Sequence, residues 1–414
     1  MVVHHKLDTG WAVIGHDPHP LTPSQQAALM HFVADATAGT HPGFGPAFTP
    51  LGLNDNLAAT LRDWPNRFTD VLLMGLGSAS YGAQMLRQWA NPSGTGARVR
   101  LVTLDHLCPA TFGELLANLD LTTTGVIGVS KSGTTLETVA MLGVVAEAFA
   151  ARGIDIGPHL AVVTEDGPSN PMALFAKAQR GALFPHHPKV NGRFSAFYET
   201  LQTPCALLGI DAGELLAGGR DVWDAFVANP TASAPVQAAQ LHLAANTPMH
   251  LVYTYGGPLK NFNLWFDSLW AECLGKTNPD GRSGPMPLGA NGPSSQHSVQ
   301  QMLLGGACDK VVTLIIPQTR GLGMASALNG AAQPPMGTLQ EAMAWGTHTA
   351  LIGHGQVVRT ITLDDRNPRD LGALCMHMML ETVASALLMN IDPFSQPDVA
   401  KSKAATLDIL YQWK

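Results

Sequence analysis

A dense group of hydroxyl side chains separates two apolar stretches in the segment VIGVSKSGTTLET, residues 126–138. An apolar run ends in Ser130, Lys131, Ser132 and Thr135, and a helical pattern of apolar residues follows directly. The free N–H groups and the positive dipole end of a helix start attract anions, and hydroxyl donors suit the acceptor oxygens of a phosphate. Serine and threonine also cap helices, so this segment alone leaves capping and phosphate binding equally open.

A second loop of small residues, GLGSASYGA at residues 75–83, also lies between an apolar run and a helical pattern. Its glycines begin as a Rossmann fingerprint does, but Ser80 stands where the third glycine is required. Asp105 ends the next apolar run, as a ribose-binding acid would, so a dinucleotide site remains an alternative. The chain has no GxxxxGK[ST] motif, which argues against a nucleotide P-loop.

A carboxylate lies at the rim of a predicted helix over residues 261–276, NFNLWFDSLWAECLGK. Phe262, Phe266 and Cys273 share one apolar stripe, and Glu272 falls at the edge of that stripe. A partly desolvated carboxylate in such a position suits a general base. The same position also suits a solvated glutamate on a helix flank.

Two further candidates lie nearer the C-terminus. His297 opens a helical pattern at the end of the Gly/Pro-rich stretch 275–298, which we expect to be a long loop. In the tail, Ser395 is the expected N-cap of a helix on which Lys403 shares a face with apolar residues, whereas Lys401 points the opposite way. A lysine on an apolar face either extends its ammonium group to water or serves a site.

The composition narrows the class of protein. The 414 residues carry a net charge of −7 and no basic block, which argues against a nucleic-acid or membrane-surface partner. Neither a metal-ligand motif nor a CxxC pair occurs, and the five scattered cysteines indicate a reducing, cytoplasmic location. We expect no signal peptide and no uncharged apolar stretch that spans a bilayer.

Strand and helix patterns alternate along the chain, which is typical of parallel sheets covered on both faces. The predicted strands are DVLLMGLG, RVRLVTL, GVIGVS, HLAVVTE, MHLVYTYG, KVVTLIIP and QVVRTITL. We therefore predict an α/β protein of two α/β/α sandwich units with mainly parallel sheets and helical extensions at both ends. The expected division is an N-terminal arm and helix (1–39), two units (40–212 and 213–380) and a helical tail (381–414).

Five segments taken together resemble the phosphoglucose isomerase family, which is built from two sugar-isomerase (SIS) domains. SKSGTTLET is similar to the family's phosphate loop SK-[TS]-x-T-T-x-E-T, and NGRFSAF resembles GGR-[FY]-S. LWAECLGK resembles E-S-x-GK, SSQHSVQQML resembles QH-[SA]-x-x-QL, and IDPFSQPDVAKSK resembles the tail I-N-x-F-D-Q-x-G-V-E-x-x-K. The segments occur in the family's order, so the resemblance extends over most of the chain.

The resemblance implies an aldose–ketose isomerase that interconverts glucose 6-phosphate and fructose 6-phosphate. Glu272 falls at the base that moves a proton between C1 and C2, and Arg193 falls at the group that stabilises the enediolate. His297 and Lys403 fall at the positions that open the sugar ring. In the family the counterpart of His297 comes from the partner subunit, which implies a homodimer with a shared active site.

The resemblance also places the substrate contacts and implies no metal and no other cofactor. Gln396 falls at a sugar contact. The positions expected to hold the substrate and its phosphate are Ser130, Lys131 (through its backbone), Ser132, Thr135, Gly77 and Ser78.

Several residues depart from the family pattern. The family's first glycine loop reads GIGGS-x-x-G, whereas Ser78 and Ala79 stand at its GS positions, and Ser268 replaces a glutamine one turn before the base. These changes leave the proton-transfer group in place but bear on affinity and sugar selectivity. An isomerase that also accepts mannose 6-phosphate therefore remains an alternative, as does a SIS-type sensor of sugar phosphates without catalysis. A sensor, however, would need only the phosphate loop.

Overall fold

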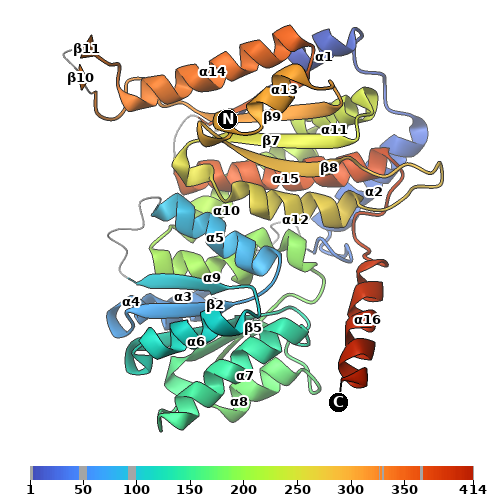
Figure 1. Ribbon diagram of the computed structural model, residues 1–414. Helices are drawn as coiled ribbons and strands as arrows, with labels where there is room; N and C mark the ends of the chain where they lie inside the picture. Colours follow the sequence, from blue (N-terminus) through green and yellow to red (C-terminus); the bar gives the residue numbers. More distant parts are fainter. Residues whose placement is uncertain are drawn as a thin grey trace.

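The computed structural model describes residues 3–45, 54–91, 99–325, 327–328, 331–363 and 367–413. Two five-stranded sheets lie one above the other, with helices between them and on their outer faces (Figure 1). The seven predicted strands are all present, and the α/β fold with mainly parallel sheets is confirmed. Five further strands were not predicted: β1 (Val3–Lys6), β6 (Ala182–Pro185), β8 (Met286–Gly292), β10 (Ala327–Leu328) and β11 (Ala331–Ala332).

The first sheet is entirely parallel. Its strands, in order across the sheet, are β3 (Arg100–Leu104), β2 (Asp70–Met74), β4 (Thr124–Val129), β5 (Leu160–Thr164) and β6 (Ala182–Pro185). Every residue of β4 and β5 is buried, as a sheet covered on both faces requires.

Helices cover both faces of the first sheet. One face packs against α6 (Pro109–Asn118), α7 (Leu136–Ala151) and α8 (Pro171–Ala178). The other face packs against α3 (Asp55–Arg62), α4 (Trp64–Arg67), α5 (Ser78–Ala90) and α9 (Glu199–Leu208). The predicted α/β/α sandwich is therefore present in this half of the molecule.

The second sheet is parallel except for one edge strand. Its order is β1 (Val3–Lys6), β12 (Val357–Leu363), β9 (Lys310–Pro317), β7 (Met249–Tyr255) and β8 (Met286–Gly292), and β1 runs antiparallel to β12. The N-terminal strand β1 thus forms an edge of the second sheet, although the other strands of that sheet all lie beyond residue 248 in the sequence. Because β8 lies within residues 275–298, the interpretation of that whole stretch as a loop is wrong.

The second sheet also has helices on both faces. One face packs against α13 (Gln300–Gly305) and α14 (Met336–His354). The other packs against α10 (Ala212–Ala228), α11 (Ala234–Ala245), α12 (Phe262–Leu274) and α15 (Pro368–Leu388). Contacts between α5 and α12 join the two halves, and Figure 1 shows both helices between the sheets.

The remaining elements lie at the periphery. They are α1 (Asp8–Ile14), α2 (Pro23–Thr37) and a short hairpin of β10 (Ala327–Leu328) and β11 (Ala331–Ala332). The N-cap Thr22 and Gln25 form the capping box that their spacing indicates. The C-terminal helix α16 (Val399–Gln412) stands apart from the body of the molecule (Figure 1), and all of its residues are exposed. Asp398, not Ser395, is its N-cap residue.

Helix α15 is, within the part of the chain that the structure describes, the one helix long and apolar enough to cross a membrane. Its most apolar window is 94% buried inside the protein. That burial is typical of the central helix of a hydrophobic core.

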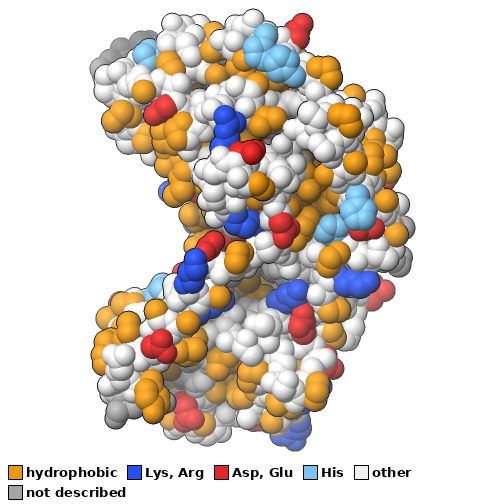
Figure 2. Space-filling model, turned by 90° about the vertical axis from the view of Figure 1, so that its right-hand side faces the viewer, with side chains coloured by type: hydrophobic (Ala, Val, Ile, Leu, Met, Phe, Trp, Pro, Cys, Tyr) orange, Lys and Arg blue, Asp and Glu red, His pale blue; other side chains and the backbone are white. Residues whose placement is uncertain are grey.

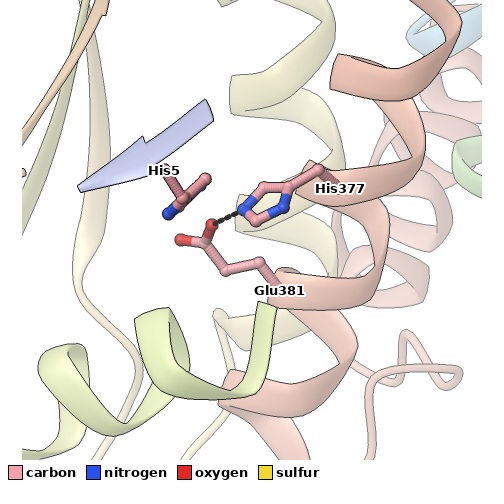
Figure 3. A group of neighbouring side chains, drawn as sticks. All are labelled: His5, His377 and Glu381. Carbon is pink, nitrogen blue, oxygen red and sulfur yellow. Dashed lines mark ion pairs between the residues drawn. The ribbon is translucent and has the colours of Figure 1, made fainter. Parts of the chain in front are cut away.

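A fully buried ion pair joins α15 to the second sheet. Nη2 of Arg359 donates to both carboxylate oxygens of Glu381, at 2.6 and 2.7 Å. His377 lies 3.2 Å from the same carboxylate, and His5 packs against the ring of His377 (Figure 3). These groups have the types and spacing of metal ligands. Because a guanidinium already occupies both carboxylate oxygens, a cation here would meet a buried positive charge, and the arrangement favours a structural role.

The buried histidines make stability depend on pH. Burial lowers the pKa of His5, His242, His250 and His377 below its ordinary value. The unfolded chain therefore takes up protons below about pH 6.5 that the folded chain does not, and stability is lost as the pH falls through that value. Between pH 7 and pH 5 we therefore expect urea titrations to show a falling free energy of unfolding.

The exposed His31 supplies the control for this prediction. Its side chain is 80% exposed and lies 3.4 Å from the carboxylate of Asp35, so His31→Asn removes an imidazole outside the core, and the loss of stability between pH 7 and pH 5 should persist. An unfolding free energy that stays constant from pH 7 to pH 5 would show that the buried histidines carry protons in the folded protein.

Candidate active site

A cavity of about 360 Å³ opens at the carboxyl ends of the strands of the first sheet. The chain runs from β2 to β3 on one side and then to β4 on the other, so the loops after β2 and β4 diverge and leave a crevice between them. Helix α12 and the segment before α16 close the cavity from the other half of the molecule. Nine of the eleven predicted site residues line it: Gly77, Ser78, Ser130, Lys131, Ser132, Thr135, Arg193, Glu272 and Gln396.

The hydroxyl groups after β4 do not cap the helix that follows. Thr135 is the N-cap residue of α7, yet its side chain makes no capping hydrogen bond and instead lies 2.8 Å from the hydroxyl of Ser130. Ser132 accepts from the backbone N–H and the hydroxyl of Thr134 within the loop itself. The capping hypothesis is therefore wrong for α7, whose first turn faces the cavity without a side-chain cap. This is the arrangement in which a helix start binds an anion.

The loop is held in shape from behind by Asn170, the N-cap of α8. Nδ2 of Asn170 donates to the carbonyl oxygens of Ser132 (3.2 Å) and Glu165 (2.7 Å), while Oδ1 accepts from a backbone N–H of α8. Gly133 has φ +64°, and a Cβ there would lie 1.9 Å from Asn170 Oδ1. Only glycine fits this turn, because both the backbone conformation and the close side chain exclude a larger residue.

The glycine loop after β2 brings α12 close to the first sheet. Gly77 has φ +59°, and a Cβ there would lie 3.8 Å from Ser268 Oγ and 3.9 Å from Glu272 Oε1. The hydroxyls of Ser78 and Ser268 are 3.5 Å apart. The loop and the helix together therefore form one wall of the cavity.

Glu272 lies at the edge of the buried face of α12, as the helical pattern predicts, with its side chain 34% exposed. Nη1 of Arg193 donates to Oε2 of Glu272 at 3.3 Å, and the hydroxyl of Ser268 donates to Oε1 at 3.4 Å. The amide of Gln396 also donates to Oε2. The carboxylate is therefore oriented by three side chains from three separate parts of the chain.

Arg193 is buried in the wall of the cavity. Its Nη2 donates to the carbonyl oxygens of Pro393 (2.7 Å) and Ser395 (3.4 Å). The guanidinium thus connects Glu272 to the segment that carries Gln396. A permanent positive charge beside a carboxylate, with both facing a cavity, is suited to stabilising a developing oxyanion.

Two predicted residues lie outside the cavity. His297 is exposed at the end of a short 3-10 helix, Ser294–His297. Lys403 is exposed on α16, and so is Lys401, which pairs with Asp398. A single copy of the chain therefore does not bring the ring-opening candidates to Glu272.

The carboxylate of Asp105 is hydrogen-bonded to side chains of α5 and is not free to bind a ribose. Its Oδ2 accepts from the hydroxyl of Ser80 at 2.9 Å and from the amide of Gln84 at 2.8 Å. Ser80, which occupies the position of the third Rossmann glycine, is thus a structural partner of this acid. The arrangement disfavours the dinucleotide alternative.

Charge is scattered over the face shown in Figure 2, with Lys and Arg side chains near the constriction between the two lobes. No extended field of one sign covers this face, in keeping with a net charge of −7. An anionic ligand would therefore be anchored by local groups such as the start of α7, not attracted by the whole surface.

Comparison with known proteins shows which family the chain belongs to. The profile of the family described as "Phosphoglucose isomerase" matches residues 64–318. A glucose-6-phosphate isomerase of Thermus thermophilus is 35% identical over 350 residues, covering 81% of this chain and 82% of the relative. The chain belongs to the phosphoglucose isomerase family.

Solved structures show the family fold over the whole chain. A crystal structure described as a hypothetical protein from Thermus thermophilus has a TM-score of 0.86 at 28% identity and covers 99% of both chains. A glucose-6-phosphate isomerase from Chlamydia trachomatis has a TM-score of 0.76 at 20% identity, covering 98% of this chain and 78% of that one.

Five residues with polar side chains line the cavity but were not predicted as site residues. They are Glu165, His186, Asn191, Ser195 and Thr200. Glu165 and His186 directly follow β5 and β6, so their position after a parallel strand was the signal that could have revealed them. The hydroxyl of Thr200 is buried and has no hydrogen-bond partner among the described residues.

Proposed function

We propose that this protein interconverts glucose 6-phosphate and fructose 6-phosphate in the cavity of the first sheet. The observation that carries the proposal is that Glu272 and Arg193 face the same cavity as the uncapped start of α7. An aldose–ketose isomerisation needs a base over C1 and C2, a positive group for the developing oxyanion and an anchor for the phosphate. One cavity offers all three.

In the proposed mechanism the phosphate binds at Ser130, Ser132, Thr135 and the backbone of Lys131. This anchor holds the open-chain sugar so that C1 and C2 lie at Glu272. The carboxylate of Glu272 removes the proton from C2 of the aldose, and the electrons of that bond form the enediolate. Arg193 stabilises the negative oxygen, the proton of the C2 hydroxyl passes to the oxygen on C1, and Glu272 returns its proton to C1 to give the ketose.

A coupled assay tests the proposal directly. The protein is supplied with fructose 6-phosphate, and a glucose-6-phosphate dehydrogenase with NADP⁺ reports the product. We expect turnover without added metal. Absence of turnover, with correctly folded protein by circular dichroism, would refute the isomerase.

The alternatives have less support. A sensor gives no reason for the three side chains that orient Glu272, and Asp105 is occupied where a dinucleotide enzyme needs it free. Ser268, in place of the family's glutamine, is the feature that bears on whether mannose 6-phosphate is accepted; an assay with that sugar as substrate decides the matter. The names of the relatives favour neither alternative.

Ring opening is proposed to need a second copy of the chain. We assign the ring-opening roles to His297, contributed by the partner of a homodimer, and to Lys403. The exposed positions of both residues in the single chain fit groups that act across an interface. Helix α16 also exposes Val399, Leu407 and Leu410, which an assembly would cover.

Mixing two inactive variants tests the shared site. Homodimers of Glu272→Gln and of His297→Ala should each be inactive. After subunit exchange, each mixed dimer holds one site with both native groups, so the mixture should regain up to about a quarter of wild-type activity. Mixed dimers that form but remain inactive would contradict a shared site.

Two further assignments complete the proposal. The division into SIS domains at 40–212 and 213–380 is supported by the separate sheets, although β1 of the arm 1–39 joins the second sheet and α15 continues into the tail 381–414. A cytoplasmic location is supported by the five free cysteines, three of them buried.

A further inference from the structure

His186 lies in the wall of the cavity. In the sequence it falls between the loop Ser130–Thr135 and Arg193. It directly follows β6, its backbone N–H donates to the carbonyl of Thr164, and only 3% of the residue is exposed. It lines the same cavity as Lys131 and Arg193. Neither the family motifs nor the proposed mechanism gives this imidazole a role.

The hydrogen bonding of His186 defines its tautomer. Nδ1 lies 3.0 Å from the carbonyl oxygen of His187. A carbonyl oxygen only accepts, so Nδ1 carries the proton and donates. The other nitrogen, Nε2, is then an unprotonated acceptor, and it makes no hydrogen bond to any other residue that the structure describes.

The charge state of His186 limits what Nε2 can bind. Burial, with a smaller contribution from the charge of Lys131, lowers the pKa of His186 to about 4, so the ring is neutral at physiological pH. The dianion of a phosphate ester has only acceptor oxygens, which the lone pair of Nε2 repels, whereas a sugar hydroxyl can donate to Nε2. With so low a pKa, the ring is also a poor general acid and a weak base.

We propose that His186 binds the sugar chain of the substrate, with Nε2 accepting a hydrogen bond from one of its hydroxyl groups. The proposal rests on the proposed function, because it assumes that the cavity holds a phosphorylated sugar. His186 then acts as a binding residue that discriminates a polyhydroxylated phosphate ester from a bare phosphate. The hydroxyl of Thr200, in the same cavity, is also buried without a hydrogen-bond partner among the described residues. Both His186 and Thr200 could therefore hydrogen-bond to a bound sugar.

The experiment compares two substitutions of His186 that differ in whether they keep a hydrogen-bond acceptor near the position of Nε2. In His186→Asn the amide can still donate to the carbonyl of His187, but the acceptor at the Nε2 position is lost. In His186→Gln the longer side chain can place an amide oxygen near that position. Calorimetry measures the Kd of each variant and of the wild type for glucitol 6-phosphate and for inorganic phosphate. Glucitol 6-phosphate carries the hydroxyl groups but has no carbonyl to isomerise.

We expect His186→Asn to weaken glucitol 6-phosphate binding by roughly three- to tenfold while the Kd for inorganic phosphate is unchanged. His186→Gln should recover part of the loss. Equal weakening for both ligands would mean that His186 only supports the loop, and unchanged binding of both would remove its role; either result overturns the inference. Because these measurements need no turnover, they are independent of the coupled assay that tests the isomerase.

Discussion

Replacing Glu272 with glutamine is expected to lower kcat for the interconversion of fructose 6-phosphate and glucose 6-phosphate by about a thousandfold. The amide has nearly the same shape and can still accept from Arg193, but it cannot take up the proton from carbon. KM should change little, because the loop Ser130–Thr135, which we propose to bind the phosphate, is untouched. Steady-state kinetics with the coupled assay measure both constants.

Glu147 provides the matched control for this substitution. It lies on the exposed side of α7, so Glu147→Gln removes the same charge without reaching the cavity. Its kcat should equal that of the wild type. If Glu272→Gln were as active as this control, another group would have to be the base.

Replacing Arg193 with lysine is expected to lower kcat by about a hundredfold and to reduce stability as well. Removal of one oxyanion donor costs about 10²–10³ in rate. A lysine cannot bind Glu272 and the carbonyls of Pro393 and Ser395 at once, because it lacks the planar fork of donors. Unpaired buried carbonyl groups add about 1–3 kcal/mol of destabilisation.

Kinetics and denaturation separate these two effects. Arg180→Lys, at a side chain that is 82% exposed, controls for a general effect of exchanging arginine for lysine. A variant Arg193→Lys that loses stability but keeps wild-type kcat below its unfolding transition would assign Arg193 a purely structural role.

The buried parallel strands could be predicted because their environment dictates their composition. Runs such as GVIGVS and HLAVVTE are apolar throughout, since helices cover both faces of the sheet. The strand β8 could not be found in this way. It contains Gly289, where a Cβ would lie 2.6 Å from Asn263 of α12, so the close packing of β8 against α12 requires glycine. Glycine is uncommon inside strands, so the sequence of β8 does not have a typical strand pattern.

The chemistry-bearing residues were predictable individually, but their mutual arrangement was not. Amphipathic spacing placed Glu272 at the edge of a helix, and its actual position agrees. Nothing local indicated that Arg193 would be buried or that it would hold the segment before α16. Helical geometry predicted which side of α16 carries Lys403. Because α16 is exposed along its whole length, knowing that side does not identify the group that Lys403 contacts.

The most direct test of the account follows the proton that Glu272 is proposed to move. The protein converts fructose 6-phosphate in D₂O, and NMR detects deuterium at C2 of the glucose 6-phosphate that forms. An enediolate mechanism with Glu272 as the base predicts deuterium at C2 with the wild type and none with Glu272→Gln over the same period. Equal incorporation of deuterium by the two proteins would contradict it.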